Sequence, residues 1–218
     1  FSETYYFDAA LLHADGVNVN FSDSLKYWFV QDGDGYVAAS ALPDLSDSSN
    51  SYIFTNLTTP SGTGTYKLIL DQNVNAASIQ LGQTSGNQDI YFRLETGQSC
   101  ESIVLGEFQN LTWSALFCGT MNEPSNTALT INGDARGIGN LFGKTNYGNF
   151  NFKKITVTGT LTVQNQGDNY AAYNAYGVEG HSISNPDAIF NVIVSNWGQG
   201  YFSYGTSGNG GGTATTED

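Results

Sequence analysis

Two aspartates in one turn are the residues best placed to bind a cation. Asp32 and Asp34 lie in the sequence Gln-Asp-Gly-Asp-Gly at positions 31–35. Alternate carboxylates of this D-x-D-G pattern can converge on one calcium ion, which prefers oxygen ligands. An EF-hand loop would place a glutamate eleven positions after Asp32, where Pro43 stands. The alternatives are therefore a calcium site at Asp32 and Asp34 or a plain Gly-Asp turn, and no other cofactor is predicted.

Cys100 and Cys118 are the only two cysteines of the chain. A single pair cannot supply the four ligands of a structural zinc site, whereas a disulfide is the usual state of such a pair in a secreted protein. The bridge would close a loop of about 18 residues and contribute on the order of 3 kcal/mol in the chain-entropy model. We predict this disulfide, with two separate buried thiols as the alternative.

The two histidines, His13 and His181, are too few for a metal site built on several imidazoles. Neither lies beside a Gly-x-Ser-x-Gly nucleophile motif. A polysaccharide lyase would need calcium-binding carboxylates and a basic residue over the substrate, for which Arg93 or Arg136 is the candidate. Because basic residues are few and scattered, we predict that the chain is not an enzyme. A polysaccharide-cleaving β-helix is kept as a minor alternative.

Aromatic side chains among amides could bind sugars, since their rings stack on pyranose faces. The best candidates are Trp197, in the sequence Asn-Trp-Gly-Gln-Gly-Tyr-Phe, and the spaced residues Tyr170, Tyr173 and Tyr176. Packing in the core or in an aromatic ladder would explain the same residues. A carbohydrate-binding module is therefore the second functional hypothesis.

Three Asn-x-Ser/Thr triplets, at Asn20, Asn56 and Asn110, are candidate N-glycosylation sites. Such triplets also arise by chance in a chain rich in Asn, so they carry little weight.

The charge balance excludes one class of partner. Lys and Arg number 7 and Asp and Glu 20, which gives a formal net charge of -13. Nucleic-acid binding needs clustered basic residues, so we predict no nucleic-acid partner. No apolar run approaches the ~20 residues of a membrane-spanning helix, so we predict no membrane insertion. A charge-poor chain rich in Gly, Asn, Thr, Ser and Tyr is typical of an extracellular or cell-surface β-protein.

Period-two alternation and β-branched or aromatic runs recur along the whole chain, and no long stretch holds an amphipathic helical pattern. An all-β protein is therefore predicted. The expected strands span residues 4–12, 25–30, 36–40, 52–55, 65–70, 77–81, 90–94, 102–105, 111–117, 128–131, 150–163, 188–195 and 201–204.

Changes in composition suggest three regions. Residues 1–60 form an acidic N-terminal β segment or cap, whose first strand could pair with the sheet edge of another copy. Residues 61–204 form the main β domain. Residues 205–218 form a Gly-rich tail with the composition of a flexible linker.

The C-terminal part of the chain resembles a known group of proteins. The stretches Gly-Ile-Gly-Asn-Leu-Phe-Gly from position 137, Asn-Phe-Lys-Lys-Ile-Thr-Val-Thr-Gly-Thr-Leu-Thr-Val from 151 and Tyr-Asn-Ala-Tyr-Gly-Val-Glu-Gly from 173 look like the Gly-rich repeats of bacterial surface proteins. The resemblance covers about residues 137–205. It implies a right-handed parallel β-solenoid of the adhesin or passenger-domain type, and it transfers no active site. A β-sandwich or jelly roll is the alternative fold.

These observations together predict a secreted structural protein. Its partners would be copies of itself, in a filament or as an adhesive subunit at the cell surface, and glycans are the secondary candidate partner.

Overall fold

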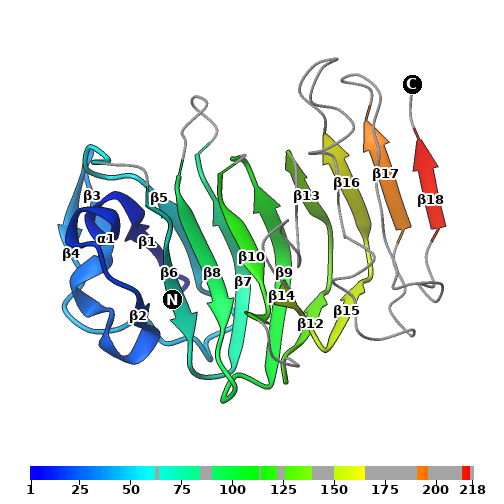
Figure 1. The fold of residues 1–218 in the computed structure, drawn as a ribbon, viewed down its shortest axis with the longest axis horizontal. Coiled ribbons are helices and arrows are strands. Elements are labelled where there is room, and N and C mark those ends of the chain that lie inside the picture. Colours follow the sequence, from blue (N-terminus) through cyan, green and yellow to red (C-terminus); the bar gives the residue numbers. More distant parts are fainter. Residues whose placement is uncertain are drawn as a thin grey trace.

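The computed structural model describes residues 1–61, 64–83, 90–112, 114–121, 126–138, 150–164, 191–195 and 213–216 of the 218-residue chain. This part of the chain is mostly sheet, with its few helical segments near the N-terminus. The strands lie side by side along the length of the molecule, and the described N-terminal elements form one end (Figure 1).

The larger of the sheets has 12 strands in the order β18-β17-β16-β13-β9-β7-β5-β1-β3-β4, and β12 pairs with both β9 and β15. Its strands are β1 (Thr4–Asp8), β3 (Trp28–Asp32), β4 (Gly35–Ala38), β5 (Ser51–Thr55), β7 (Val74–Leu81), β9 (Ser102–Asn110), β12 (Ala128–Ile131), β13 (Ala135–Ile138), β15 (Lys154–Val157), β16 (Thr160–Gln164), β17 (Asn191–Ser195) and β18 (Thr213–Thr216).

A smaller sheet has four strands in the order β10-β8-β6-β2. Its strands are β2 (Val19–Asn20), β6 (Tyr66–Leu70), β8 (Phe92–Thr96) and β10 (Leu116–Cys118). A separate antiparallel pair joins β11 (Thr120–Met121) to β14 (Phe150–Asn151).

Successive strands of the middle region alternate between the two sheets. β5, β7 and β9 belong to the larger sheet, and each is followed along the chain by a strand of the smaller one, β6, β8 and β10. Within each sheet these neighbours are parallel. Between two successive strands of the larger sheet, the chain therefore forms one strand of the smaller sheet. This alternation brings the apolar faces of the two sheets together.

The N-terminal segment is more varied, for local reasons. Helix α1 (Ala9–Asp15) starts where the Asp8 side chain accepts hydrogen bonds from the amides of the first turn, and it ends at Gly16 with a φ of 66°. Two 3-10 turns, η1 (Phe21–Asp23) and η2 (Leu25–Tyr27), lead into β3. A two-residue turn joins β3 to the antiparallel β4, with Gly33 at a φ of 59°.

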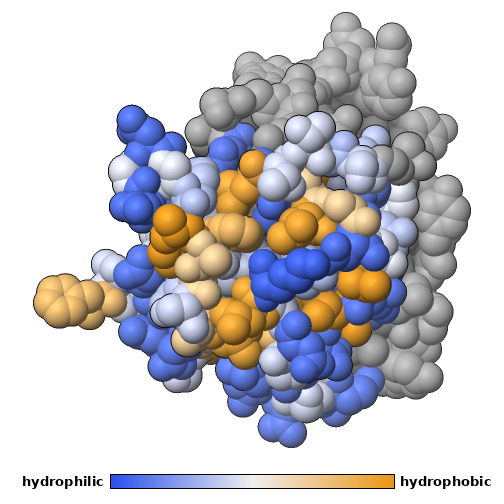
Figure 2. Space-filling model, turned by 90° about the vertical axis from the view of Figure 1, so that its left-hand side faces the viewer, coloured by the Kyte–Doolittle hydropathy of each residue, from blue (hydrophilic) through white to orange (hydrophobic). Residues whose placement is uncertain are grey.

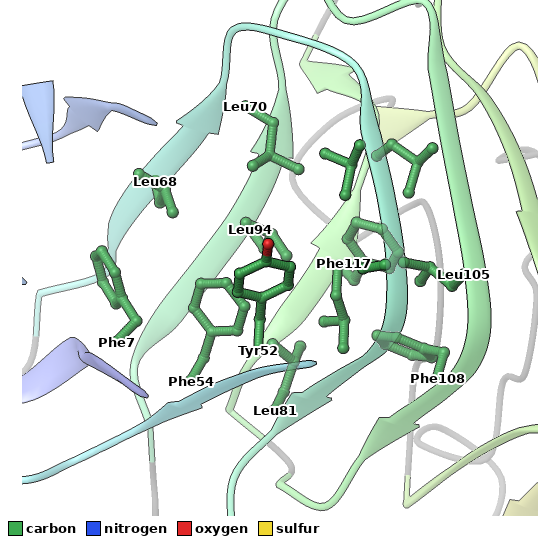
Figure 3. Packing of buried hydrophobic residues seen from close by; sticks show 14 of the residues in the cluster. Phe7, Tyr52, Phe54, Leu68, Leu70, Leu81, Leu94, Leu105, Phe108 and Phe117 are labelled. Carbon is green, nitrogen blue, oxygen red and sulfur yellow. The ribbon is translucent and has the colours of Figure 1, made fainter. Parts of the chain in front are cut away.

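The core lies between the two sheets. Figure 3 shows side chains of the larger sheet facing those of the smaller sheet, among them Tyr52 and Leu94. Phe54 of β5 stacks on Phe92 of β8 with ring centroids 5.3 Å apart, and both side chains are buried. Burial of these rings contributes favourably to folding, because each removes a large apolar area from water.

The predicted right-handed parallel β-solenoid is wrong, as is the alternative β-sandwich or jelly roll. The sheets combine parallel with antiparallel strands and are not closed, and helical segments interrupt the N-terminal region. Alternation marks where a strand lies, but it is the same whichever way the neighbouring strand runs. The antiparallel β3–β4 pair results from the Gly33-Asp34 turn, whereas β3 reaches its antiparallel place beside β1 through the helical segments between them. The helix follows from the cap at Asp8.

Part of the predicted Gly-rich tail is a strand, since β18 pairs in parallel with β17. Among the helices of the described residues, none is long and apolar enough to cross a membrane.

Candidate interaction surface at the β4 edge

The larger sheet extends beyond its facing sheet at the N-terminal end. β2 is the last strand of the smaller sheet, whereas β3 and β4 continue the larger one past β1. Tyr5, Val30 and Val37 are neighbours across these three strands and therefore share one face. Tyr5 and Val30 are half-buried, and Val37 is 45% exposed. The side chains of this row thus become more exposed from β1 to β4, and β4 lies outside the core.

A pocket of about 420 Å³ lies beside this row, within the size range of ligand sites. The loop after β4 forms its wall and is held in place by a 2.9 Å hydrogen bond from the Ala39 amide to the Trp28 carbonyl. The end of the molecule that faces the viewer in Figure 2 carries apolar residues among hydrophilic ones. We call the pocket and the free edge of β4 the β4 edge site; its lining residues are Glu3, Tyr5, Val30, Val37, Ala38, Ala39, Ser40, Ala41 and Leu42.

The outer edge of β4 presents backbone groups that β3 does not use. Because the Ala39 amide bonds to β3, the alternation of an antiparallel ladder also directs the groups of Val37 and Gly35 to β3. The N–H and C=O groups of Tyr36 and Ala38 therefore point to the other side. Among the described residues, β4 pairs with β3 alone, and all four of its residues are exposed.

Negative charge surrounds this site. Burial raises the pKa of Tyr5, whose side chain lines the pocket. The carboxylates of Glu3, Asp44 and Asp47 raise that pKa further. Hydrogen bonds from the serines two positions along the chain lower the pKa of Asp44 and of Asp47, so both stay ionised at neutral pH.

The two predicted calcium ligands lie at the tip of the β3–β4 hairpin, next to this site. Asp32 ends β3 and Asp34 lies in the turn, and both are exposed. Within the described ranges, no group of three or more His, Cys, Asp or Glu residues gathers to hold a metal. Calcium takes six to eight oxygen ligands, so binding at Asp32 and Asp34 stays a prediction that would need additional ligands.

The predicted disulfide is not formed, because Cys100 and Cys118 are separate buried thiols. Cys100 follows the turn at Gly97 and belongs to the core between the sheets. Cys118 lies opposite Glu95 at the end of β10, in a separate apolar cluster with Leu116. The two side chains thus belong to different clusters, a distinction that spacing along the chain does not show.

We expect neither thiol of the folded protein to react with a thiol reagent at pH 8. The thiolate is the reactive form; burial raises the pKa of Cys100 to about 11 and also raises that of Cys118. Titration with an aromatic disulfide reagent should detect no thiol in the native protein and both in denaturant. Absence of free thiols in unreduced, denatured protein would show that the disulfide forms after all.

The three glycosylation candidates lie in different surroundings. Asn20 is exposed on β2, and Asn56 is half-buried after β5. Asn110 is fully buried, and its side-chain amide donates to the Ala115 carbonyl at 3.0 Å. Asn110 therefore cannot carry a glycan in the folded protein, which corrects that candidate.

Of the candidate catalytic residues that the structure describes, His13 and Arg93 occupy structural positions. His13 of α1 is 8% exposed and packs against Tyr66 and Tyr91. Neither of its ring nitrogens has a hydrogen-bond partner among the described residues. The Arg93 Nη1 atom lies 3.6 Å from Oε2 of the buried Glu95, and the Lys67 Nζ atom lies 3.3 Å from Oε1 of the same carboxylate. Arg93 thus contributes to an ion-pair cluster on the smaller sheet. Arg136 is exposed on β13.

The predicted sugar-binding residues Trp197, Tyr170, Tyr173 and Tyr176, together with His181, lie outside the described residues.

Sequence reasoning placed a strand on each side of the Gly-Asp turn, at residues 25–30 and 36–40, but it missed the edge site. The signal was present in the run Tyr-Val-Ala-Ala-Ser-Ala-Leu at positions 36–42, because a hairpin strand without polar alternation has no side suited to water. What the run does not show is that β4 has only β3 beside it in the described structure.

The fold and this surface define a mostly-sheet protein with open, mixed sheets and an accessible strand edge. Comparisons with protein-family models, with curated proteins and with solved structures found no match.

Proposed function

We propose that this chain is a secreted structural protein that assembles with copies of itself through the β4 edge site. The observation that carries the proposal is an exposed, uncharged edge strand beside a mostly apolar pocket. Its role would be mechanical or adhesive, outside the cell or at the cell surface, and without catalysis.

The composition of β4 supports an edge that is used. Soluble sheet proteins commonly block their edges with lysine, proline, bulges or inward-pointing charges, since a free edge pairs with other chains. β4 reads Gly-Tyr-Val-Ala and contains none of these residues. Tyr36 and Val37 are 39% and 45% exposed, so pairing at this edge would also bury apolar surface.

The overall charge sets the conditions for assembly. Copies with a formal net charge of -13 repel one another, but at physiological ionic strength this repulsion is screened beyond about 8 Å. Backbone hydrogen bonds and apolar contacts act at shorter range and survive screening. Assembly should therefore increase with salt, and calcium should promote it further if Asp32 and Asp34 bind the ion.

The positions of the catalytic candidates support a role without catalysis. Arg93 is engaged by Glu95, and His13 lies beneath two tyrosine rings. Arg93 is thus held in an ion pair on the smaller sheet. The His13 ring is buried away from any substrate, although its ring nitrogens have no hydrogen-bond partner among the described residues.

Sedimentation velocity and negative-stain electron microscopy of the full chain test this proposal. We expect the average mass to rise with protein concentration and with sodium chloride, to that of a dimer or beyond. Ordered assemblies on the grids would show that a second surface takes part as well. Parallel samples with calcium and with chelator separate metal bridging from screening. Uniform monomers at every concentration and salt would contradict the proposal.

A further inference from the structure

We propose that two copies meet at β4 across a twofold axis, with their β4 strands antiparallel and Val37 opposite the partner's Val37. This inference rests on the proposed self-assembly and specifies the geometry of its first contact. The larger sheet of one copy would then continue into that of the other through the paired β4 edges.

The hydrogen-bonding groups of the edge select this register. The outward N–H and C=O groups belong to Tyr36 and Ala38, on either side of Val37. In an antiparallel pair centred on Val37, Tyr36 bonds to the partner's Ala38, and Ala38 bonds to the partner's Tyr36. Every outward group of the strand is then paired. A slip of one residue would set outward groups against groups that already bond to β3.

Charge favours the antiparallel arrangement over the parallel one. Parallel strands in register would bring the Asp32–Asp34 turn of one copy beside the same turn of the other, and like charges that close repel. In the antiparallel register, Asp34 would lie beside the partner's Ser40, and Gly33 of the same turn would lie beside the partner's Ala41. These direct neighbours are uncharged, so the antiparallel register costs less repulsion than the parallel one. The carboxylates of Glu3, Asp44 and Asp47 beside each pocket still repel those of the partner, which is why we expect association to increase with salt.

Both faces of the paired strands gain apolar contacts. Directly opposite residues of an antiparallel pair lie on the same face, so Val37 and the partner's Val37 would meet on the pocket side. The two pockets would then adjoin across the axis. On the other face, the ring centroid of Tyr36 already lies 4.8 Å from that of Tyr6. The Tyr36 side chain would there cover the partner's Ala38.

A contact of this kind is isologous and closes after two copies. The dimer would therefore be the unit of assembly, and growth into longer structures would need a second surface.

Cysteine cross-linking tests the register directly. In the proposed pair the two Val37 Cα atoms would form a non-hydrogen-bonded pair about 4.5 Å apart, within the range for a disulfide. The two Tyr36 Cα atoms would be diagonal neighbours, about 7 to 8 Å apart and at or beyond the upper limit. With oxidised glutathione as the oxidant, Val37→Cys should give a covalent dimer and Tyr36→Cys should stay largely uncross-linked. The native thiols are buried and should not interfere.

A proline substitution tests the edge itself. Ala38→Pro removes one outward N–H from each copy but leaves the bonds from Val37 and Gly35 to β3, and proline is tolerated at such edge positions. We expect dimerisation to weaken by about tenfold or more, since two hydrogen bonds are lost per dimer. Ala38→Ser keeps the N–H and is the matched control, expected to dimerise as the native chain does.

The outcomes separate this inference from the function on which it rests. A covalent dimer of Val37→Cys alone, with weakened association of Ala38→Pro, supports the inference. Concentration-dependent assembly that cross-links equally in both cysteine variants, or in neither, overturns the β4 register but leaves self-assembly standing. A chain that stays monomeric under all conditions overturns both.

Discussion

Replacing Gly133 with alanine is expected to destabilise the protein by about 3 kcal/mol, at the upper end of the usual cost of overpacking. A Cβ at this position would overlap the backbone carbonyl oxygen of Gly106. A Cβ at Gly106 would lie 2.7 Å from the Ala77 carbonyl oxygen, and one at Gly159 would lie 2.5 Å from that of Gly133. The three glycines thus form a column in which each backbone packs directly against the next.

The column lies where β9 changes its pairing partner from β12 to β13. β9 pairs with β12 through Ser102–Leu105 and with β13 through Phe108–Asn110, and Gly106 lies between these two stretches. The neighbouring glycines occupy the corresponding breaks, after β12 and after β15. Since the obstructing atoms belong to the backbone, an added methyl group can be accommodated only if the strands move apart.

Equilibrium unfolding in urea measures this effect, with Gly35→Ala as the control. A Cβ at Gly35 would lie 3.8 Å from its nearest neighbour, the Asp32 carbonyl oxygen, which is an ordinary contact. The free energy of unfolding of the Gly35→Ala variant should change by no more than about 1 kcal/mol. If Gly133→Ala and Gly35→Ala unfold at the same urea concentration, the inference that the three glycines pack backbone against backbone is wrong.

The sequence allowed several strands to be placed, because alternation is a local property. The expected strand at 128–131 coincides with β12, and that at 52–55 lies within β5. The expected strand at 150–163 is divided into β14, β15 and β16. Gly159 lies at the second of these breaks, which shows how one glycine in the column interrupts an otherwise regular pattern.

The helix was missed although its signals are local. Residues 4–12 were expected as one strand, but β1 ends at Asp8 and α1 begins at Ala9. An aspartate followed by Ala-Ala-Leu-Leu-His-Ala combines a preferred N-cap with good helix formers. The preceding Thr-Tyr-Tyr-Phe run masked this signal, because strong strand formers lead directly into the cap.

The edge site and the state of the cysteines could not be predicted, for a different reason. Both depend on which strands pair, and pairing is not local. Val37 becomes exposed because the smaller sheet ends at β2, and Cys100 is separated from Cys118 because they belong to different apolar clusters. Neither fact is encoded in the residues next to the one concerned.

Asp8→Ala should cost on the order of 3 kcal/mol, because one buried carboxylate holds two segments together. Asp8 is fully buried. Its Oδ1 accepts from the amides of Ala10 and Leu11 at the start of α1, and from the amide of Leu57 after β5. Its Oδ2 accepts from the hydroxyl of Thr58. Removing the carboxylate leaves these donors without the acceptor around which the helix start and the loop are arranged.

Asp8→Asn is the informative comparison in the same urea experiment. Its amide oxygen can still accept from the backbone amides, and its NH2 group can donate to the Thr58 hydroxyl after that hydroxyl turns. We therefore expect the asparagine variant to lose less than half of what the alanine variant loses. Equal losses in both variants would mean that the negative charge, rather than the acceptor geometry, stabilises this junction. No loss in either would mean that α1 and the loop after β5 are held by their apolar contacts alone.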